Sequence, residues 1–198
     1  MSPHVLAAFL IIRYQFKIIS MKSHQSGFTL VELLITVAIV AVLASLAVPS
    51  FRTMLVKRSV QAAADTFVSD MRYARSEAVK RSTRTVVCRS TDGIACSGVG
   101  NLRDGWIVFV DRDASNSVTT GDDVVRVQQA FANIASIQSL VPANDIHTFK
   151  FEPTGWAKAA TQSFIFSPVG TVPAGTTRLV CVSITGRAAL RAEGVAVC

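Results

Sequence analysis

Residues that could carry catalysis are few and scattered in this chain. Only one of the three histidines, His147, lies beyond residue 30, and it falls within a strand-like pattern. No spacing brings a nucleophile, a base and an acid together, so the sequence predicts a protein that is not an enzyme. Gly98-Val99-Gly100 does not precede a helix, which argues against a phosphate-binding loop. We expect no cofactor.

One acidic stretch carries oxygen-bearing side chains at alternating positions, as calcium-binding loops of the EF-hand type do. These residues are Asp111, Asp113, Ser115, Ser117 and Asp122. Asn116 stands where such a loop requires glycine, Asp122 replaces the usual glutamate, and no helical pattern flanks the stretch. We therefore expect a solvated acidic hairpin loop and no bound metal.

The four cysteines are Cys88, Cys96, Cys181 and Cys198. They form no Cys-x-x-Cys pair, which argues against zinc. An even number beyond an apolar anchor indicates disulfides in an oxidising compartment, with buried free thiols as the alternative. Cys88 and Cys96 border a loop that a disulfide could close. Cys181 and Cys198 would lie opposite each other if strands flank residues 185–194.

The longest apolar run, from Leu30 to Val48, predicts a helix that spans a membrane. Its polar residues are Glu32, Thr36 and Ser45. Nineteen residues at a rise of about 1.5 Å give roughly 28 Å, close to the thickness of the hydrocarbon layer. Lys22 precedes the run in a short leader, which favours a cytoplasmic N-terminus and places the rest of the chain across the membrane.

Beyond the apolar run the helical pattern continues to about Thr83. Pro49 removes a backbone donor, so we expect it to bend the helix rather than end it. Apolar residues then recur every three or four positions, which predicts an amphipathic helix; they are Val60, Ala64, Phe67, Met71, Ala74 and Ala78. Basic residues mostly point away from this face, and we expect them to be solvated; they are Arg72, Arg75, Lys80 and Arg81.

After Arg84 the period becomes strand-like, with glycines between the runs. The expected strands are residues 85–88, 106–110, 124–131, 134–141, 147–151, 163–166 and 177–184. The sequence thus predicts an α+β fold in which a long N-terminal helix packs on a head of antiparallel β-sheets. The predicted parts are a leader (1–27), a transmembrane and assembly helix (28–50), its amphipathic continuation (51–83) and a β-rich head (84–198).

The start of the apolar run reads Gly27-Phe28-Thr29-Leu30-Val31-Glu32 and resembles the processing site of type IV pilins and type II secretion pseudopilins. The resemblance implies that prepilin peptidase cuts between Gly27 and Phe28 and N-methylates Phe28. It implies that Glu32 meets the N-terminal amine of a neighbouring subunit during assembly. Pro49 matches the proline that kinks the helix in this family.

Residues 105–127 extend the resemblance. Gly105-Trp106-Ile107-Val108-Phe109-Val110-Asp111-Arg112-Asp113 and the segment 121–126 look like the H-type pseudopilin and FimT/FimU minor pilin family. That family has an N-terminal helix packed on two antiparallel sheets. Counted from Met21, the leader would be seven residues long, polar and basic, so we expect residues 1–20 to reflect a start codon placed too early.

The C-terminal part suggests a ligand. Arg187 and Arg191 would lie near the tip of a terminal hairpin, where arginines can reach DNA phosphates without reading sequence. FimT-type minor pilins bind DNA through a C-terminal Gly-Arg-x-Arg motif; this chain has Gly186-Arg187, but the second arginine is displaced to position 191. Lys158 is a weaker candidate. The alternative is that these residues only keep the tip soluble.

Taken together, these patterns predict a minor pilin of a type IV pilus, held in the bacterial inner membrane by one helix with its head in the periplasm. Its expected partners are other pilins or pseudopilins, prepilin peptidase, the inner membrane and double-stranded DNA, bound without sequence preference. The nearest alternative is the H-type minor pseudopilin of a type II secretion system. A membrane-anchored periplasmic enzyme is a third alternative, which the lack of a catalytic constellation disfavours.

Overall fold

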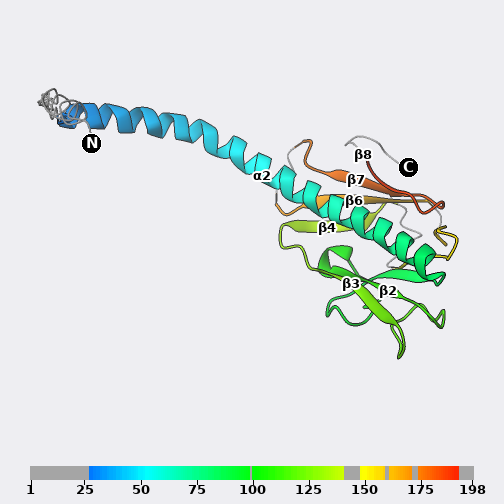
Figure 1. Cartoon of the computed structure of the whole chain (residues 1–198). Coiled ribbons are helices and arrows are strands. Elements are labelled where there is room, and N and C mark those ends of the chain that lie inside the picture. The colour runs from blue at the N-terminus through cyan, green and yellow to red at the C-terminus, as the bar shows by residue number, and fades with distance from the viewer. Residues whose placement is uncertain (1–26, 99, 141–147, 159–160, 171–173, 192–198) are drawn as a thin grey trace, which may run out of the picture. The chain divides into compact units, whose positions relative to one another are not determined.

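The computed structural model describes residues 27–98, 100–140, 148–158, 161–170 and 174–191, apart from the side chains of residues 46 and 49 (Figure 1). Residues 1–26 of the predicted leader, His147 and Cys198 lie outside the described residues. The chain divides into two compact units, residues 1–45 and 46–198. We describe each unit by itself, beginning with the first part of helix α2 (Leu30–Arg81).

Helix α2 begins directly after a capping residue. The Thr29 hydroxyl accepts a hydrogen bond from the Glu32 backbone N–H at 3.2 Å, and Glu32 lies in the first turn, where a carboxylate favours the helix dipole. Two polar side chains inside the apolar run bond within the helix: the Thr36 hydroxyl donates to the Leu33 carbonyl and the Ser45 hydroxyl to the Val42 carbonyl. These bonds satisfy the hydroxyl protons without water.

The first part of α2 has no buried side, which distinguishes it from a core helix. Its large apolar side chains from Phe28 to Leu43 are 55% to 83% exposed. By length and composition this helix could cross a membrane, with a mean hydropathy of 2.6 in its most apolar window. The helix continues through residue 49, so the proline there does not end it. The predicted bend at Pro49 stays a prediction.

The described part of the head contains eight strands in two antiparallel four-stranded sheets (Figure 1). One sheet has the order β3-β2-β1-β5 and the other β4-β6-β7-β8. The bounds are β1 Thr85–Arg89, β2 Gly105–Val110, β3 Asp123–Gln129, β4 Ile134–Ser139, β5 Thr148–Phe151, β6 Gln162–Pro168, β7 Arg178–Val182 and β8 Ala188–Arg191. A 3₁₀ turn, Leu102–Asp104, precedes β2. The predicted α+β architecture is confirmed, although several predicted strand ends differ by one or more residues.

The second part of α2 packs its apolar face on both sheets. Every apolar residue predicted for this face is fully buried. The Phe67 ring meets two rings of each sheet, with centroids 5.3 Å to 6.3 Å away: Trp106, Phe149, Phe164 and Phe166. Most of these contacts are edge-to-face or tilted, the arrangements that aromatic quadrupoles favour. The core of the head therefore closes around a helix residue.

A buried carboxylate on α2, Asp70, also joins the helix to one sheet through directional hydrogen bonds. Asp70 is 2% exposed and accepts hydrogen bonds from the Trp106 indole N–H at 2.8 Å and from the Arg126 guanidinium at 2.7 Å. Burial raises the pKa of Asp70 although both hydrogen bonds oppose the shift. Because β2 carries Trp106 and β3 carries Arg126, this carboxylate fixes the rotation of the helix against one sheet.

The basic face of α2 is largely solvated, as expected: Arg72, Lys80 and Arg81 are exposed, whereas Arg75 is partly buried. All four residues also make contacts that the sequence did not predict, and Lys80 pairs with Glu77 at 3.7 Å. Arg72 donates to the Ala188 carbonyl at 3.2 Å and 3.3 Å, and Arg75 donates to the Gly155 carbonyl at 2.9 Å. Arg81 pairs with Glu77 and Asp123. The contacts of Arg72 and Arg75 join segments more than 75 residues apart in sequence, so only the folded head reveals them.

The predicted register of the terminal hairpin is also wrong. Cys181 pairs with Ala189 rather than with Cys198, because the turn closes sooner than residues 185–194 would allow. The Ser183 N–H donates to the Arg187 carbonyl at 3.0 Å, and Gly186 has a φ of 75°, which favours glycine. Cys181 is disulfide-bonded, and its predicted partner lies outside the described residues. The predicted Cys88–Cys96 disulfide is present.

Replacing Phe67 with alanine should lower the free energy of unfolding of the head by about 3–5 kcal/mol, because the substitution leaves a cavity between the helix and both sheets. Urea unfolding of residues 46–198 measures the loss. Ser69→Ala, an exposed change on the same helix, should alter the stability by less than about 0.5 kcal/mol. Equal losses in the two variants would contradict the central position of Phe67.

Candidate assembly and binding surfaces

The predicted processing site lies just before the first turn of α2. Gly27 and Phe28 are outside the helix, and Phe28 is 83% exposed. A methyl group added to Gly27 would meet nothing within 4 Å. The peptide bond between them is thus free of both helical hydrogen bonding and packing, as a peptidase substrate must be. Glu32 is exposed one turn further along the same helix.

Two turns at one end of the head lie in direct contact. The Ala157 N–H, after β5, donates to the Ile184 carbonyl at 2.9 Å, in the turn between β7 and β8. A Cβ on Gly186 would lie only 2.3 Å from the Gly155 carbonyl oxygen, so the approach requires glycine. Arg75 of α2 contacts both turns, since its side chain reaches Gly155 and would touch that same Cβ.

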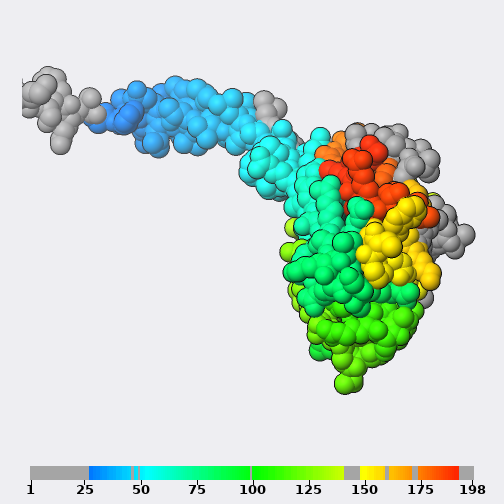
Figure 2. Space-filling view, turned by 45° about the vertical axis from the view of Figure 1, so that its right-hand side comes forward, coloured from blue at the N-terminus to red at the C-terminus, as the bar shows by residue number. Residues whose placement is uncertain are grey.

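Exposed basic residues gather on these turns, with Lys158 following the first and Arg187 ending the second. We call this surface the basic end; its residues are Arg72, Arg75, Arg84, Lys158 and Arg187. Glu152 is the acidic neighbour and pairs with Arg84 at 3.1 Å. Figure 2 shows the segment around residue 155 in yellow between the green end of α2 and the red C-terminal strand.

A shallow hollow on the basic end exposes an aromatic ring. Its lining residues are Arg84, Glu152, Trp156, Ala157, Lys158 and Ile184. Trp156 is 55% exposed and Ile184 is 49% exposed. The sequence pattern assigned no binding role to Trp156, Arg72 or Arg75, although a tryptophan beside Gly155 in a predicted turn could have indicated this surface.

The structure separates the two arginines of the predicted tip. Arg187 lies in the turn, whereas Arg191 ends β8 opposite Leu179. Four residues at about 3.3 Å each put them roughly 13 Å apart along the strand. The expectation that Arg191 lies near the tip is therefore wrong, because the short turn moves it to the other end of β8. Lys158 is the predicted residue that lies next to the turn of Arg187.

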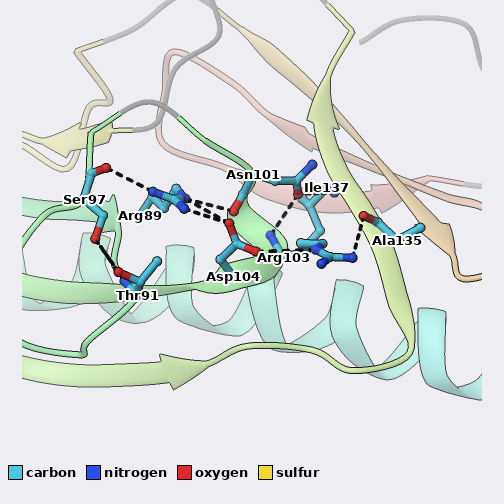
Figure 3. A network of polar contacts seen from close by, with 8 residues as sticks. All are labelled: Arg89, Thr91, Ser97, Asn101, Arg103, Asp104, Ala135 and Ile137. Carbon is cyan, nitrogen blue, oxygen red and sulfur yellow. Dashed lines mark hydrogen bonds and ion pairs between the residues drawn. The ribbon is translucent and has the colours of Figure 1, made fainter.

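The Arg89 guanidinium organises a second polar cluster, which is structural (Figure 3). It donates to the Ser97 carbonyl at 3.0 Å and to the Asp104 carboxylate at 2.8 Å, so it holds the disulfide-closed loop. The Asn101 side-chain oxygen accepts from the Ile137 N–H at 2.9 Å, which joins this loop to strand β4 of the other sheet. Hydrogen bonding to Arg89 lowers the pKa of Asp104.

The acidic stretch between β2 and β3 is only partly solvated, contrary to expectation. Asp111 is 1% exposed because it directly follows the fully buried strand β2. Burial raises its pKa, whereas hydrogen bonds from Ser115 and Thr119 lower the pKa of Asp113 to about 2. Asp111, Asp113 and Asp122 each bring one oxygen to within 4.8 Å of the others.

A helix with an exposed apolar first part, whose second part packs on two antiparallel sheets, is the architecture of a pilin-like protein. The chain belongs to the family described as type II transport protein GspH, whose model matches residues 63–186. The model of the prokaryotic N-terminal methylation motif matches residues 22–48. This motif and the apolar helix fit a membrane-anchored pilin, and the family implies assembly with other pilins.

Known proteins support the same class. The chain is 32% identical over 110 residues to a type IV major fimbrial protein FimA of Dichelobacter nodosus, covering 56% of this chain and 53% of the relative. Another FimA of that organism is 35% identical over 106 residues, 52% of this chain and 63% of the relative. The chain thus spans between half and two thirds of the length of these relatives.

The crystal structure of the type IV minor pilin FimU of Pseudomonas aeruginosa has the same fold. Its TM-score is 0.51 at 18% identity, over 68% of this chain and 89% of FimU. At this identity the likeness concerns the fold alone.

Replacing Asp104 with asparagine should destabilise the head by about 1–2 kcal/mol at pH 7, since Arg89 loses its charged partner. The lowered pKa means that the ionised carboxylate stabilises the fold above the ordinary value of 3.8, and that this contribution disappears as the pH falls through the folded-state pKa. Urea unfolding at pH 7 and at pH 3 should therefore show a smaller difference between variant and wild type at pH 3. An equal difference at both pH values would contradict the role given to this charge.

Proposed function

We propose that the chain is a minor pilin of a type IV pilus, held by one helix in the inner membrane with its head in the periplasm before assembly. The observation that carries this proposal is the exposed apolar part of α2, whose large side chains from Phe28 to Leu43 are more than half exposed. Such a surface is stable only against lipid or against other apolar helices. A filament whose core consists of these helices provides both environments in turn. We propose a structural role without catalysis.

We propose that prepilin peptidase cuts between Gly27 and Phe28 and methylates the new N-terminus. The methylation motif supports this, and so does the exposure of both residues ahead of the first helical turn. Cleavage would leave a positive amine at Phe28, beside the helix start that Thr29 caps.

The Glu32 carboxylate is the proposed assembly contact. An isolated carboxylate in an apolar environment is costly, and the cost falls when it meets a positive group. Within its own helix Glu32 gains only the first-turn dipole. The amine of a neighbouring subunit supplies a full charge and fixes the axial register of the two helices.

Glu32→Ala should leave cleavage intact but reduce incorporation into filaments at least about tenfold, the factor that corresponds to 1.4 kcal/mol. Immunoblots of sheared filaments measure incorporation, and N-terminal sequencing measures cleavage. Thr36→Ala is the matched control, because this polar residue bonds within the helix and needs no partner. Normal incorporation of Glu32→Ala would refute the assembly contact.

A second candidate is the H-type minor pseudopilin of a type II secretion system. The family model that matches residues 63–186 carries the description of a type II transport protein, and this observation favours it. The Glu32→Ala strain separates the two candidates. Loss of surface pili supports the pilus, whereas retention of normally secreted proteins in the periplasm supports the secretion system.

We propose further that the basic end contacts double-stranded DNA through phosphates. The basic end carries five basic side chains, and its acidic neighbour Glu152 is already paired with Arg84. Arg72 and Arg75 are held by backbone carbonyls, so their guanidinium groups are oriented before a ligand arrives. Preordered charges lose less side-chain freedom on binding. Lys158 and Arg187 are exposed and complete the surface.

The double variant Lys158→Ala with Arg187→Ala should weaken DNA binding by residues 46–198 about tenfold near 0.1 M salt. The slope of log K against log salt should fall by about 1.8, since each lost phosphate contact removes about 0.9. Fluorescence anisotropy with a short duplex at several salt concentrations measures both quantities.

The matched control, Lys57→Ala with Arg58→Ala, removes two charges from helix α2 and should leave affinity and slope nearly unchanged. Arg191→Ala should have a smaller effect than Arg187→Ala, because it lies at the other end of β8. Equal weakening by the control and the test pair would leave net charge as the explanation and contradict a localised DNA surface.

A further inference from the structure

Three carboxylates converge in the loop between β2 and β3, apart from the surfaces described above. Asp111, Asp113 and Asp122 each place one oxygen within 4.8 Å of the other two. Asp113 is exposed and Asp122 is partly buried, so the cluster opens to solvent on one side. Three negative groups at this separation repel one another unless a positive charge lies between them.

Asp111 supplies a second observation, because part of its buried carboxylate has no donor. The side chain is 1% exposed. One oxygen accepts a hydrogen bond from the Asn116 N–H at 3.2 Å. The other is fully buried, and no N–H or hydroxyl donor reaches it within the described part of the chain. The Asp111 carboxyl instead lies within hydrogen-bonding reach of Asp113, which is itself an acceptor. Two carboxylates that face each other are satisfied only by a shared proton or by a cation between them.

The Asn116 side-chain oxygen is a further buried acceptor for which the described residues offer no donor. Asn116 is the sixth residue of the stretch that begins at Asp111, where an EF-hand-type loop places glycine for a sharp turn. Its φ of 65° lies in the left-handed region, which asparagine adopts more readily than most residues. Asparagine in place of glycine argued against a metal in the sequence pattern. In the structure this asparagine adopts the left-handed conformation that glycine would supply.

The nearby arginine does not neutralise the cluster. The Arg112 side chain donates to the Gly121 carbonyl and to the Asp123 carboxylate, at 2.6 Å in the second case. Its guanidinium is therefore occupied outside the three converging oxygens. Arg84 attracts Asp111 electrostatically, but its guanidinium pairs with Glu152 at 3.1 Å. A cation held by the three oxygens would supply positive charge between them.

We infer that the loop binds a divalent cation, preferentially calcium, through Asp111, Asp113 and Asp122. Oxygen ligands indicate a hard cation. Calcium accepts irregular sets of oxygen ligands, whereas magnesium demands a near-ideal octahedron and keeps several of its waters. Three carboxylates gathered in one loop therefore favour calcium. The bound ion would stiffen the loop next to Asp123, which pairs with Arg81 at the end of α2.

Titration of calcium chloride into the full chain in detergent micelles, after removal of metals with EDTA, tests the inference. Isothermal titration calorimetry in 0.15 M sodium chloride should give one calcium ion per chain with a Kd of about 10⁻⁴ to 10⁻³ M, the range of extracellular sites. Thermal unfolding in 10 mM calcium should show an unfolding constant about 10- to 100-fold lower than in EDTA. Magnesium should bind at least tenfold more weakly.

Asp113→Asn and Asp122→Asn should each weaken calcium binding at least tenfold. Asp65→Asn is the matched control, since it removes one exposed carboxylate from α2, far from the loop in sequence, and should leave the Kd unchanged. Wild-type protein that binds no calcium at 10 mM overturns the inference, whether or not the variants fold. An equal loss in Asp65→Asn, or tighter binding of magnesium than of calcium, would also overturn it.

Discussion

The ring of Phe67 is the point where helix α2 and both sheets of the head meet. Two aromatic rings from each sheet surround it, and all of them belong to one continuous core. Because the helix is seated there, Arg72 and Arg75 come within reach of carbonyls at Ala188 and Gly155. The positions of these two arginines in the basic end are therefore a consequence of core packing around Phe67.

One helix serves two environments, and its residues divide accordingly. The large side chains from Phe28 to Leu43 are apolar on every side and exposed, whereas from Val60 onward one apolar face is buried. A helix of the first kind requires lipid or partner helices, and a helix of the second kind requires a head. Two of the polar residues in the first part, Thr36 and Ser45, donate their hydroxyl protons to carbonyls of the same helix. Glu32 is then the polar residue whose side chain remains available to a partner.

Much of the fold could be predicted from the sequence because helices and strands depend on local periodicity. Cys88 and Cys96 are only eight residues apart, so their disulfide could likewise be predicted from the local sequence. The register of the last hairpin was missed because only the folded chain shows that Gly186 closes a short turn against Gly155. The burial of Asp111 was missed for a related reason, since an acidic loop pattern does not reveal that its first residue continues a buried strand.

The order of the strands along the chain has a consequence for how the head folds. Strand β5 completes the first sheet, yet in sequence it lies between β4 and β6 of the second sheet. Neither sheet can be finished as a separate module, and the bond from Arg72 to Ala188 spans 116 residues. Such non-local closure makes folding slow and cooperative. A chain shortened before β8 would leave its core open, so the apolar helix is joined to a closed head only after β8 has been made.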